Sequence, residues 1–123
     1  MAALSIRIDL DPHGRIGPGK IELLEAIQRE GSISAAGRAM DMSYRRAWDL
    51  VDETAKIFGR PVVASQAGGK HGGGAKLTEF GEELVARYRA IEKAAARAVK
   101  AELATLQSGA RPESEEAKRG DAA

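Results

Sequence analysis

Two helix patterns separated by a very short turn constrain the fold of this chain more than any other feature. The segment SISAAGRAM predicts a short helix, capped by Ser32 or Ser34, with a face of small residues. The segment SYRRAWDLVDETAKIFG predicts a longer helix that begins at the capping residue Ser43 and ends at Gly59. Because only DMS separates the two patterns, the helices must cross closely, and the alanines of the first helix leave room for that crossing. Together the two segments predict a helix-turn-helix unit.

The segments on either side of this unit predict a small domain. LSIRIDLDP alternates apolar and polar residues, which predicts a half-buried strand, and DPHGRIGPG, with two prolines and three glycines, predicts a break after it. PGKIELLEAIQREG predicts a helix from Pro18 to Gly31. PVVASQA and AKLT predict two strands around a glycine-rich segment, and therefore a β-hairpin. A hairpin directly after the second helix makes a winged helix-turn-helix, so the expected fold class is mainly α with a small β-sheet.

A long apolar stripe follows the hairpin. Residues 78–107 predict one long helix, and its stripe consists of Phe80, Leu84, Tyr88, Ile91, Ala95, Ala98 and Leu106. On a helix that extends beyond a small domain, such a stripe would be exposed in a monomer, so we expect it to mediate dimerisation. The alternative, that the stripe folds back onto the chain's own core, stays open. Residues 1–77 are then the winged helix-turn-helix domain, and the polar residues 108–123 are expected to be a disordered tail.

Composition excludes several classes of protein. The chain of 123 residues has no cysteine, so it has no disulfide and no thiolate nucleophile. No apolar run approaches the roughly 20 residues of a membrane span, and the start lacks the features of a signal peptide, so we expect a cytoplasmic protein with no membrane partner. The net charge is +1, but residues 13–76 hold ten lysines and arginines against seven acidic residues, a weak bias towards an anionic partner.

The glycine-rich segment GGKHGGGAKLT does not fit an enzyme site. Gly69 and Gly74 have the first spacing of a phosphate-binding P-loop, but Ala75 and Lys76 follow where lysine and Ser/Thr are needed. The two histidines, His13 and His71, lie far apart in the sequence, so no metal site is expected. No serine stands with a histidine in a nucleophile motif. We therefore expect no enzyme activity and no cofactor.

The start of the second helix carries the residues expected to bind DNA. In a helix-turn-helix this part enters the major groove, and here it consists of Ser43, Tyr44, Arg45 and Arg46. Arginine can pair with guanine, while hydroxyls and the helix start can bind phosphates. The alternatives are that both arginines are solvated charges paired with Asp49, and that Tyr44 stacks into the core.

Three further positions beside this helix start carry predictions. We expect Trp48 to be buried, because it continues the inward face of its helix. Ser32 and Ser34 are expected first to cap their helix and secondly to contact a phosphate. Between the two predicted strands, the tip of the wing consists of Lys70, His71, Gly72 and Gly73. Its glycines permit a tight turn and a close approach of the backbone to DNA.

These segments resemble a known family. GSISAAGRAMDMSYRRAWDLVDE, GGKHGGGAKLTEFGEELVARY and the helix that follows are similar to the N-terminal, LysR-like winged-helix DNA-binding domain of ModE, the molybdate-responsive transcriptional regulator, over residues 4–106. The resemblance implies a homodimer on a palindromic operator in double-stranded DNA. By motif, residues 43–46 match the start of the recognition helix, residues 68–74 match the wing, and the helix from Thr78 matches the dimerisation helix.

The chain departs from the family in one respect. The family senses molybdate through a separate C-terminal part made of small β-barrels, whereas polar residues follow the long helix here. We therefore expect a regulator of genes for molybdate uptake or of other molybdenum-related genes. It is expected to respond to molybdate or tungstate only through a separate protein. Two alternatives are a winged-helix adaptor for protein interactions and a single-domain oxyanion-binding protein. The glycine-rich wing favours DNA over the adaptor, and calorimetry with molybdate would test the oxyanion protein.

Overall fold

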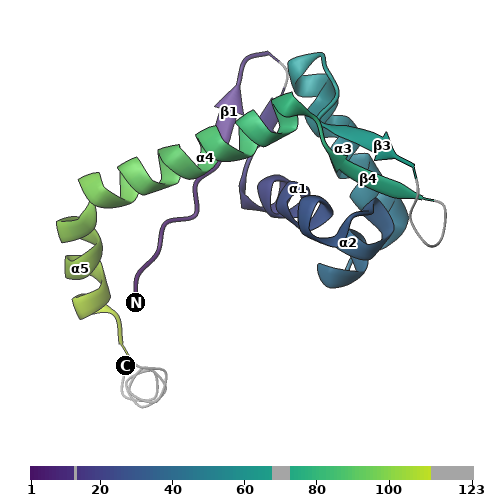
Figure 1. Ribbon diagram of the computed structural model, residues 1–123. Helices are drawn as coiled ribbons and strands as arrows, with labels where there is room; N and C mark the ends of the chain where they lie inside the picture. The colour runs from purple at the N-terminus through teal and green to yellow at the C-terminus, as the bar shows by residue number, and fades with distance from the viewer. Residues whose placement is uncertain (13, 68–72, 112–123) are drawn as a thin grey trace. The chain divides into compact units, whose positions relative to one another are not determined.

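The computed structural model describes residues 1–12, 14–67 and 73–111 and divides the chain into two compact units. One unit is Ser5–Ile91, and the other combines Met1–Leu4 with the chain from Glu92 onward. The described residues form five helices and two small antiparallel sheets (Figure 1). The expected fold class, mainly α with a small β component, is confirmed, although the strands make two separate sheets.

The first sheet is a short hairpin near the N-terminus. Strands β1 (Ile8–Leu10) and β2 (Gly14–Ile16) pair antiparallel, with Ile8 opposite Ile16. Partly buried and exposed residues alternate along residues 4–10 as predicted, but only the last three form a strand because only these have a partner strand opposite them. The partner strand was not predicted, since its glycine and the nearby prolines indicated a break.

Three helices begin and end at the residues that the sequence indicated. Helix α1 (Pro18–Glu30) has proline at its start and ends at Gly31 in the left-handed conformation. Helix α2 (Ile33–Ala39) is capped by Ser32. Helix α3 (Tyr44–Phe58) is capped by Ser43, whose hydroxyl accepts a hydrogen bond from the Arg46 N–H at 3.0 Å. It ends at Gly59, also left-handed, where a residue with a side chain would be strained.

The turn between α2 and α3 depends on small residues at one point of the crossing. A Cβ on Gly37 would lie 3.2 Å from the Met42 carbonyl oxygen and 3.4 Å from the Cβ of Ala47. The Met42 N–H donates to the Gly37 carbonyl at 2.8 Å, and Asp41 adopts φ 57° within the turn. Ala36 and Ala47 are fully buried here, so the predicted close crossing of the two helices is confirmed.

The core of Ser5–Ile91 lies between α1, α3 and the start of the following helix. Its fully buried side chains include Leu23, Leu24 and Ile27 of α1. Helix α4 (Glu79–Ala98) contributes Tyr88, which is 2% exposed and packs with the β2 and α1 residues Ile16 and Ile21. The Tyr88 hydroxyl donates a hydrogen bond to the Ile6 carbonyl at 2.5 Å.

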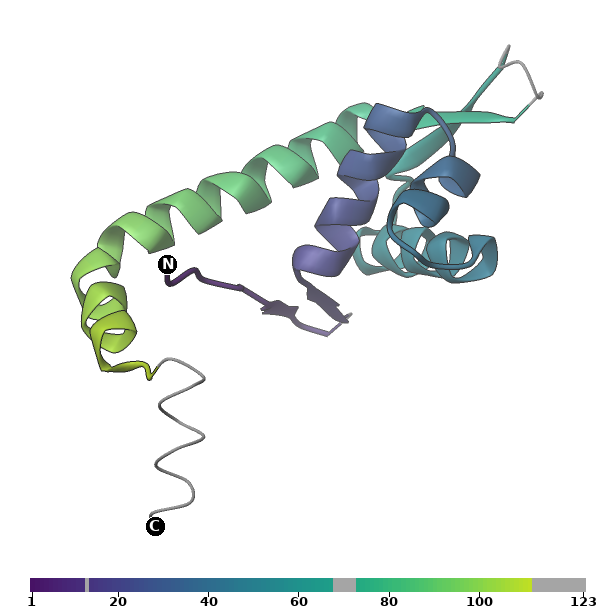
Figure 2. The ribbon, with the colours of Figure 1, turned by 90° about the horizontal axis from the view of Figure 1, so that it is seen from below.

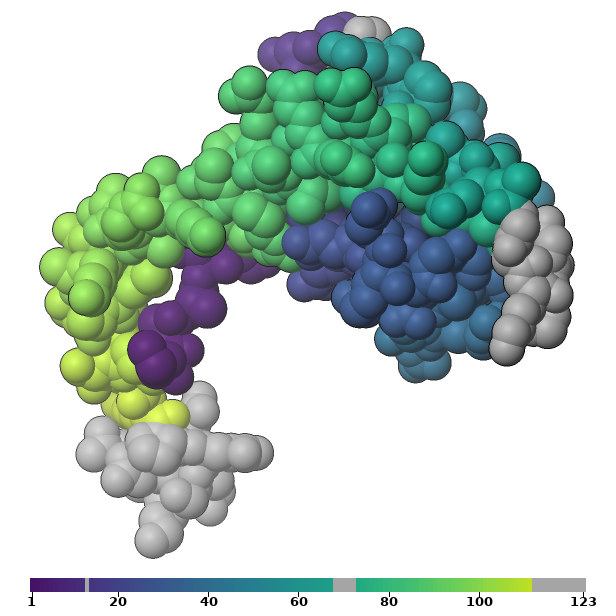
Figure 3. Space-filling model, viewed as in Figure 1, coloured from purple at the N-terminus to yellow at the C-terminus, as the bar shows by residue number. Residues whose placement is uncertain are grey.

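The second sheet is the hairpin that follows α3. Strands β3 (Val63–Gln66) and β4 (Gly74–Leu77) pair with Val63 opposite Leu77 and Gln66 opposite Gly74. Two hydrogen bonds tie β4 to α1: the Ala75 N–H donates to the Gly31 carbonyl at 2.8 Å, and the Leu77 N–H donates to the Gln28 side chain at 3.0 Å. Figure 2 shows the hairpin beside the C-terminal end of α1 and the start of α2, and Figure 3 shows its surface next to the blue surface of this region. The predicted hairpin is confirmed in its two strands.

The helix predicted over residues 78–107 is divided in two. Helix α4 ends at Ala98, and α5 (Lys100–Gly109) begins after Val99, whose backbone lies outside the helical region at φ −111° and ψ 16°. Val99 is the only β-branched residue between Ile91 and Thr105, which gives it a lower helix propensity than the alanines around it. Helix α5 also includes the first two residues of the predicted tail, and residues 112–123 lie outside the described part.

Candidate nucleic-acid interface

The first turn of α3 is open to solvent. Tyr44 is 55% exposed, and the side chain of Arg45 is 84% exposed. Arg46 is also exposed and has no ion-pair partner among the described residues. This turn contains no acidic side chain. Tyr44 therefore does not stack into the core, and the predicted helix start presents a hydroxyl and two guanidinium groups to solvent.

Further along α3, acidic and basic side chains neutralise each other. Arg45 contacts Asp49 with an Nε–Oδ1 distance of 3.3 Å, and Lys56 contacts Asp52 with an Nζ–Oδ2 distance of 2.9 Å. The hydrogen bond to Asp52 and the attraction of its charge raise the pKa of Lys56. The pairing with Asp49, which was the alternative left open for both arginines, is thus present for Arg45, whereas Arg46 has no ion-pair partner among the described residues.

Trp48 does not lie where the sequence predicted. It is 44% exposed, whereas the prediction placed it on the buried face of its helix. The buried positions of α3 are Ala47, Leu50, Thr54 and Ile57. Successive residues of a helix are rotated by about 100°, so position 48 lies close to the side of α3 opposite these buried residues. The expectation of a buried Trp48 was wrong because the inward face of α3 includes Ala47 but does not continue to the next residue.

The start of α2 brings two serines and an arginine together. Ser32 accepts a hydrogen bond from the Ala35 N–H at 3.0 Å, so it is the capping residue. Ser34 accepts one from the Arg38 guanidinium at 2.8 Å. Sequence reasoning missed Arg38, although its position four residues after Ser34 on a predicted helix was the available signal.

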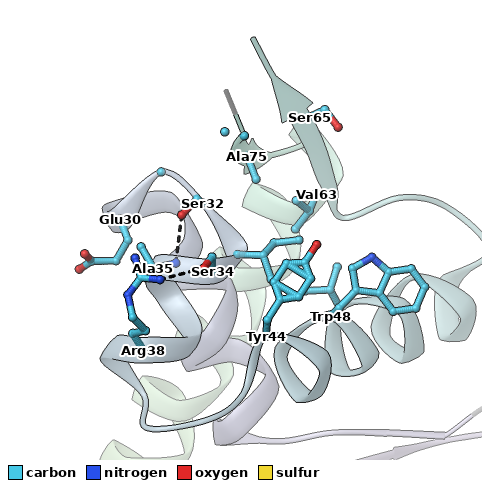
Figure 4. Close-up of a pocket in the computed structure, with 15 residues that line it drawn as sticks. Glu30, Ser32, Ser34, Ala35, Arg38, Tyr44, Trp48, Val63, Ser65 and Ala75 are labelled. Carbon is cyan, nitrogen blue, oxygen red and sulfur yellow. Dashed lines mark hydrogen bonds between the residues drawn. The ribbon is translucent and has the colours of Figure 1, made fainter. Parts of the chain in front are cut away.

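A groove of about 910 Å³ lies between α2, α3 and the hairpin (Figure 4). Its lining includes Ser32, Ser34, Arg38, Tyr44, Trp48 and Ser65. Gly73, the described member of the predicted wing tip, also lines it. Arg45 and Arg46 do not belong to this lining. The structure therefore brings four of the predicted site residues to one groove and leaves the two arginines outside it.

The other wing-tip residues, Lys70, His71 and Gly72, lie outside the described residues. Gly73 is exposed, with open space where a Cβ would be. In the part of the chain that the structure describes, no group of three or more histidine, aspartate and glutamate side chains is placed to hold a metal ion. None of the helices formed by these residues is long and apolar enough to cross a membrane.

The predicted dimerisation stripe divides between buried and exposed positions. Tyr88 is buried, and Phe80 and Leu84 pack against core residues of Ser5–Ile91. The first half of the stripe thus folds onto the chain's own core, which was the alternative left open. Ile91 is 46% exposed and Leu106 is 71% exposed. Ala98 is exposed and Ala95 is partly buried, so the surface available to a second copy is the later half.

The order of elements in Ser5–Ile91 is consistent with the winged helix-turn-helix class, because a helix-turn-helix is followed directly by a two-stranded hairpin. Comparison with known proteins identifies individual relatives with similar sequences. The sequence matches no protein-family model. It is 44% identical over 85 residues to the "Molybdenum transport protein ModE" of Azotobacter vinelandii, which covers 69% of this chain and 32% of that protein.

Two other relatives also carry the name ModE or Mop. The "Molybdenum-pterin-binding protein MopB" of Rhodobacter capsulatus is 49% identical over 83 residues, or 68% of this chain and 31% of that protein. The "DNA-binding transcriptional dual regulator ModE" of Escherichia coli (strain K12) is 39% identical over 71 residues, or 58% of this chain and 27% of that protein. The chain spans about a third of the length of the curated relatives it matches. Its similarity to ModE and Mop proteins is therefore a similarity to part of them.

Proposed function

We propose that this chain is a sequence-specific DNA-binding transcriptional regulator of the ModE kind, which acts in the cytoplasm as a homodimer on genes for molybdate uptake or molybdenum use. The observation that carries the proposal is the first turn of α3, where Tyr44, Arg45 and Arg46 are exposed and no acidic residue is present. A relative named as a DNA-binding transcriptional regulator and others named for molybdenum support it.

The proposed contacts divide between base edges and phosphates. Arg45 and Arg46 are long, exposed and positively charged, and such side chains pair with guanine O6 and N7 or with phosphate oxygens. Arg45 must leave Asp49 to do so, which costs little because an exposed ion pair of this kind contributes roughly 0.3–0.5 kcal/mol. Ser32, Ser34 and Ser43 contact phosphates in this proposal, and Lys70, with His71 beside it, is the phosphate contact of the wing.

A selection of binding sites from random duplexes, followed by affinity measurements, tests this proposal. Replacing Arg45 with alanine is expected to lower affinity for the selected site and to relax the preference at one base pair, by about 1–3 kcal/mol of discrimination. Replacing Lys70 with alanine is expected to weaken binding about equally on all sequences. A selection in which the protein enriches no DNA sequence would contradict the proposal.

The adaptor alternative has one observation in its favour. The outer face of α3 carries two acid–base pairs, so beyond its first turn the helix has little positive charge for a duplex. An adaptor would use the exposed aromatic side chains of α3 for a protein partner and would show no DNA preference. The same selection experiment separates the two functions, because only the regulator enriches a sequence.

A further inference from the structure

The exposed face of α3 carries an aromatic pair that the proposed arginine contacts do not use. Tyr44 and Trp48 lie one helical turn apart, and both of these large side chains are exposed to solvent. Neither belongs to a core cluster of the described residues. Within those residues, neither the Tyr44 hydroxyl nor the Trp48 ring N–H has a hydrogen-bond partner. The free protein therefore leaves this aromatic surface in water, at a cost that a binding partner would remove.

The groove beside this pair has little net charge. Figure 4 shows Tyr44 and Trp48 at the side of α3 that faces β3, near Val63. The described lining residues include two charged ones, Glu30 and Arg38, which have opposite signs. Serine hydroxyls and apolar side chains make up much of the remainder. Beside the serines that are proposed to contact phosphates, a surface of this composition suits an uncharged ligand with both polar and apolar edges.

Base edges in the major groove have this character. Each base pair presents hydrogen-bond donors and acceptors there, and thymine alone among the four bases adds a methyl group. The groove adjoins the exposed start of α3, and Arg45 and Arg46 of that start are not among its lining residues. The arrangement therefore separates the charged groups of the helix start from its aromatic groups.

We propose that Tyr44 and Trp48 are specificity-determining residues that read thymine methyl groups in the major groove. This inference rests on the proposed DNA binding and adds the kind of base that is read. The two rings cover one or two methyl groups at fixed positions of the site, while the Arg45 and Arg46 side chains bind the phosphates or guanines next to them.

Substitution of thymine by deoxyuridine removes the methyl group and leaves every base-pair hydrogen bond in place, so it tests the inference directly. On the site obtained by selection, deoxyuridine at a contacted thymine position is expected to weaken binding of the wild-type chain about four-fold, the effect of one buried methyl group. Trp48→Gln should bind more weakly and lose this sensitivity, whereas Trp48→Leu should retain part of it. Arg45→Ala is the matched control, because it should weaken binding and keep the sensitivity to the methyl group.

Trp48 is the only tryptophan of the chain, so its fluorescence provides a second readout. Saturation with the selected duplex, followed independently by anisotropy of a dye on the DNA, is expected to change the tryptophan emission. Specific binding with unchanged emission, or with the same response to deoxyuridine in wild type and Trp48→Gln, would overturn the inference and leave the proposed function standing. A surface that serves a protein partner would give that result. Failure to select any sequence would overturn both.

Discussion

At the scale of single residues, two helical glycines have opposite roles. Gly81 is buried in the first turn of α4, and a Cβ there would overlap the Val62 carbonyl oxygen. That oxygen belongs to the backbone and cannot move aside without shifting the start of the hairpin. Gly19, in the first turn of α1, has open space around its Cβ position and ordinary backbone geometry. The close approach at Gly81 therefore requires glycine, whereas Gly19 does not.

Alanine substitutions at these glycines are expected to change stability in opposite directions. Gly81→Ala should lower the free energy of unfolding by about 3 kcal/mol, since an overpacked core site commonly costs about 1–3 kcal/mol and this overlap is with backbone. Gly19→Ala should raise the free energy of unfolding by roughly 0.5–1 kcal/mol, through helix propensity and a less flexible unfolded chain. Urea denaturation followed by circular dichroism measures both. Equal effects of the two substitutions would show that the backbone contact at Gly81 is not restrictive.

At the scale of elements, the hairpin is held to α1 by a side chain. The Leu77 N–H donates to the Gln28 side chain, and the neighbouring Ala75 N–H donates to the Gly31 carbonyl. Gln28→Met keeps the length of the side chain and removes the acceptor, so the Leu77 N–H loses its partner at a cost of about 1–3 kcal/mol. Amide hydrogen exchange at Leu77 should become faster. Gln107→Met, at an exposed position of α5, is the control and should leave that exchange rate unchanged.

The elements that could be predicted from the sequence are those with explicit start and stop residues. Ser43 and Gly59 bound α3, and Pro18 and Gly31 bound α1, because caps and left-handed turns need particular residue types. Strand β2 was missed, since it is only three residues long and lies among turn-forming glycines and prolines, and its pairing with β1 is a tertiary contact. The break at Val99 lacks proline and glycine and was missed for a similar reason.

The candidate site was predictable in position but not in detail. The exposed helix start, with Arg45 and Arg46, follows from the helix-turn-helix pattern. The exposure of Trp48 does not, because it depends on which side of α3 the core residues occupy. Arg38 and Ser65 enter the groove through the placement of α2 and β3, which no local pattern specifies.

At the scale of the whole molecule, the dimer proposal now rests on the later half of the apolar stripe. Ile91, Ala95 and Ala98 follow one another on the same face of α4 at helical spacing, and Leu106 is exposed on α5. Tyr88 is already buried within Ser5–Ile91, so it is not available to a second copy. The proposed interface is therefore smaller than the stripe predicted from the sequence.

A charge placed in that interface is expected to separate the dimer. Ile91→Glu would bury an unpaired carboxylate on association, so light scattering at a fixed protein concentration should show a dimer for the wild-type chain and a monomer for this variant. Lys93→Glu introduces the same residue at an exposed position two residues away and should remain dimeric. A wild-type chain that is already monomeric, or two variants that behave alike, would contradict this interface.

The central claim, that this chain binds DNA, is tested most directly by one titration. The full chain is added to a dye-labelled duplex from its own upstream region, and anisotropy is measured over a range of salt concentrations. We predict binding for which the logarithm of the association constant falls linearly with the logarithm of salt concentration, with a slope of about −0.9 for each phosphate neutralised. For Lys70→Ala the slope should be smaller in magnitude by about 1. No binding at low salt, or an affinity that does not change with salt, would contradict the claim.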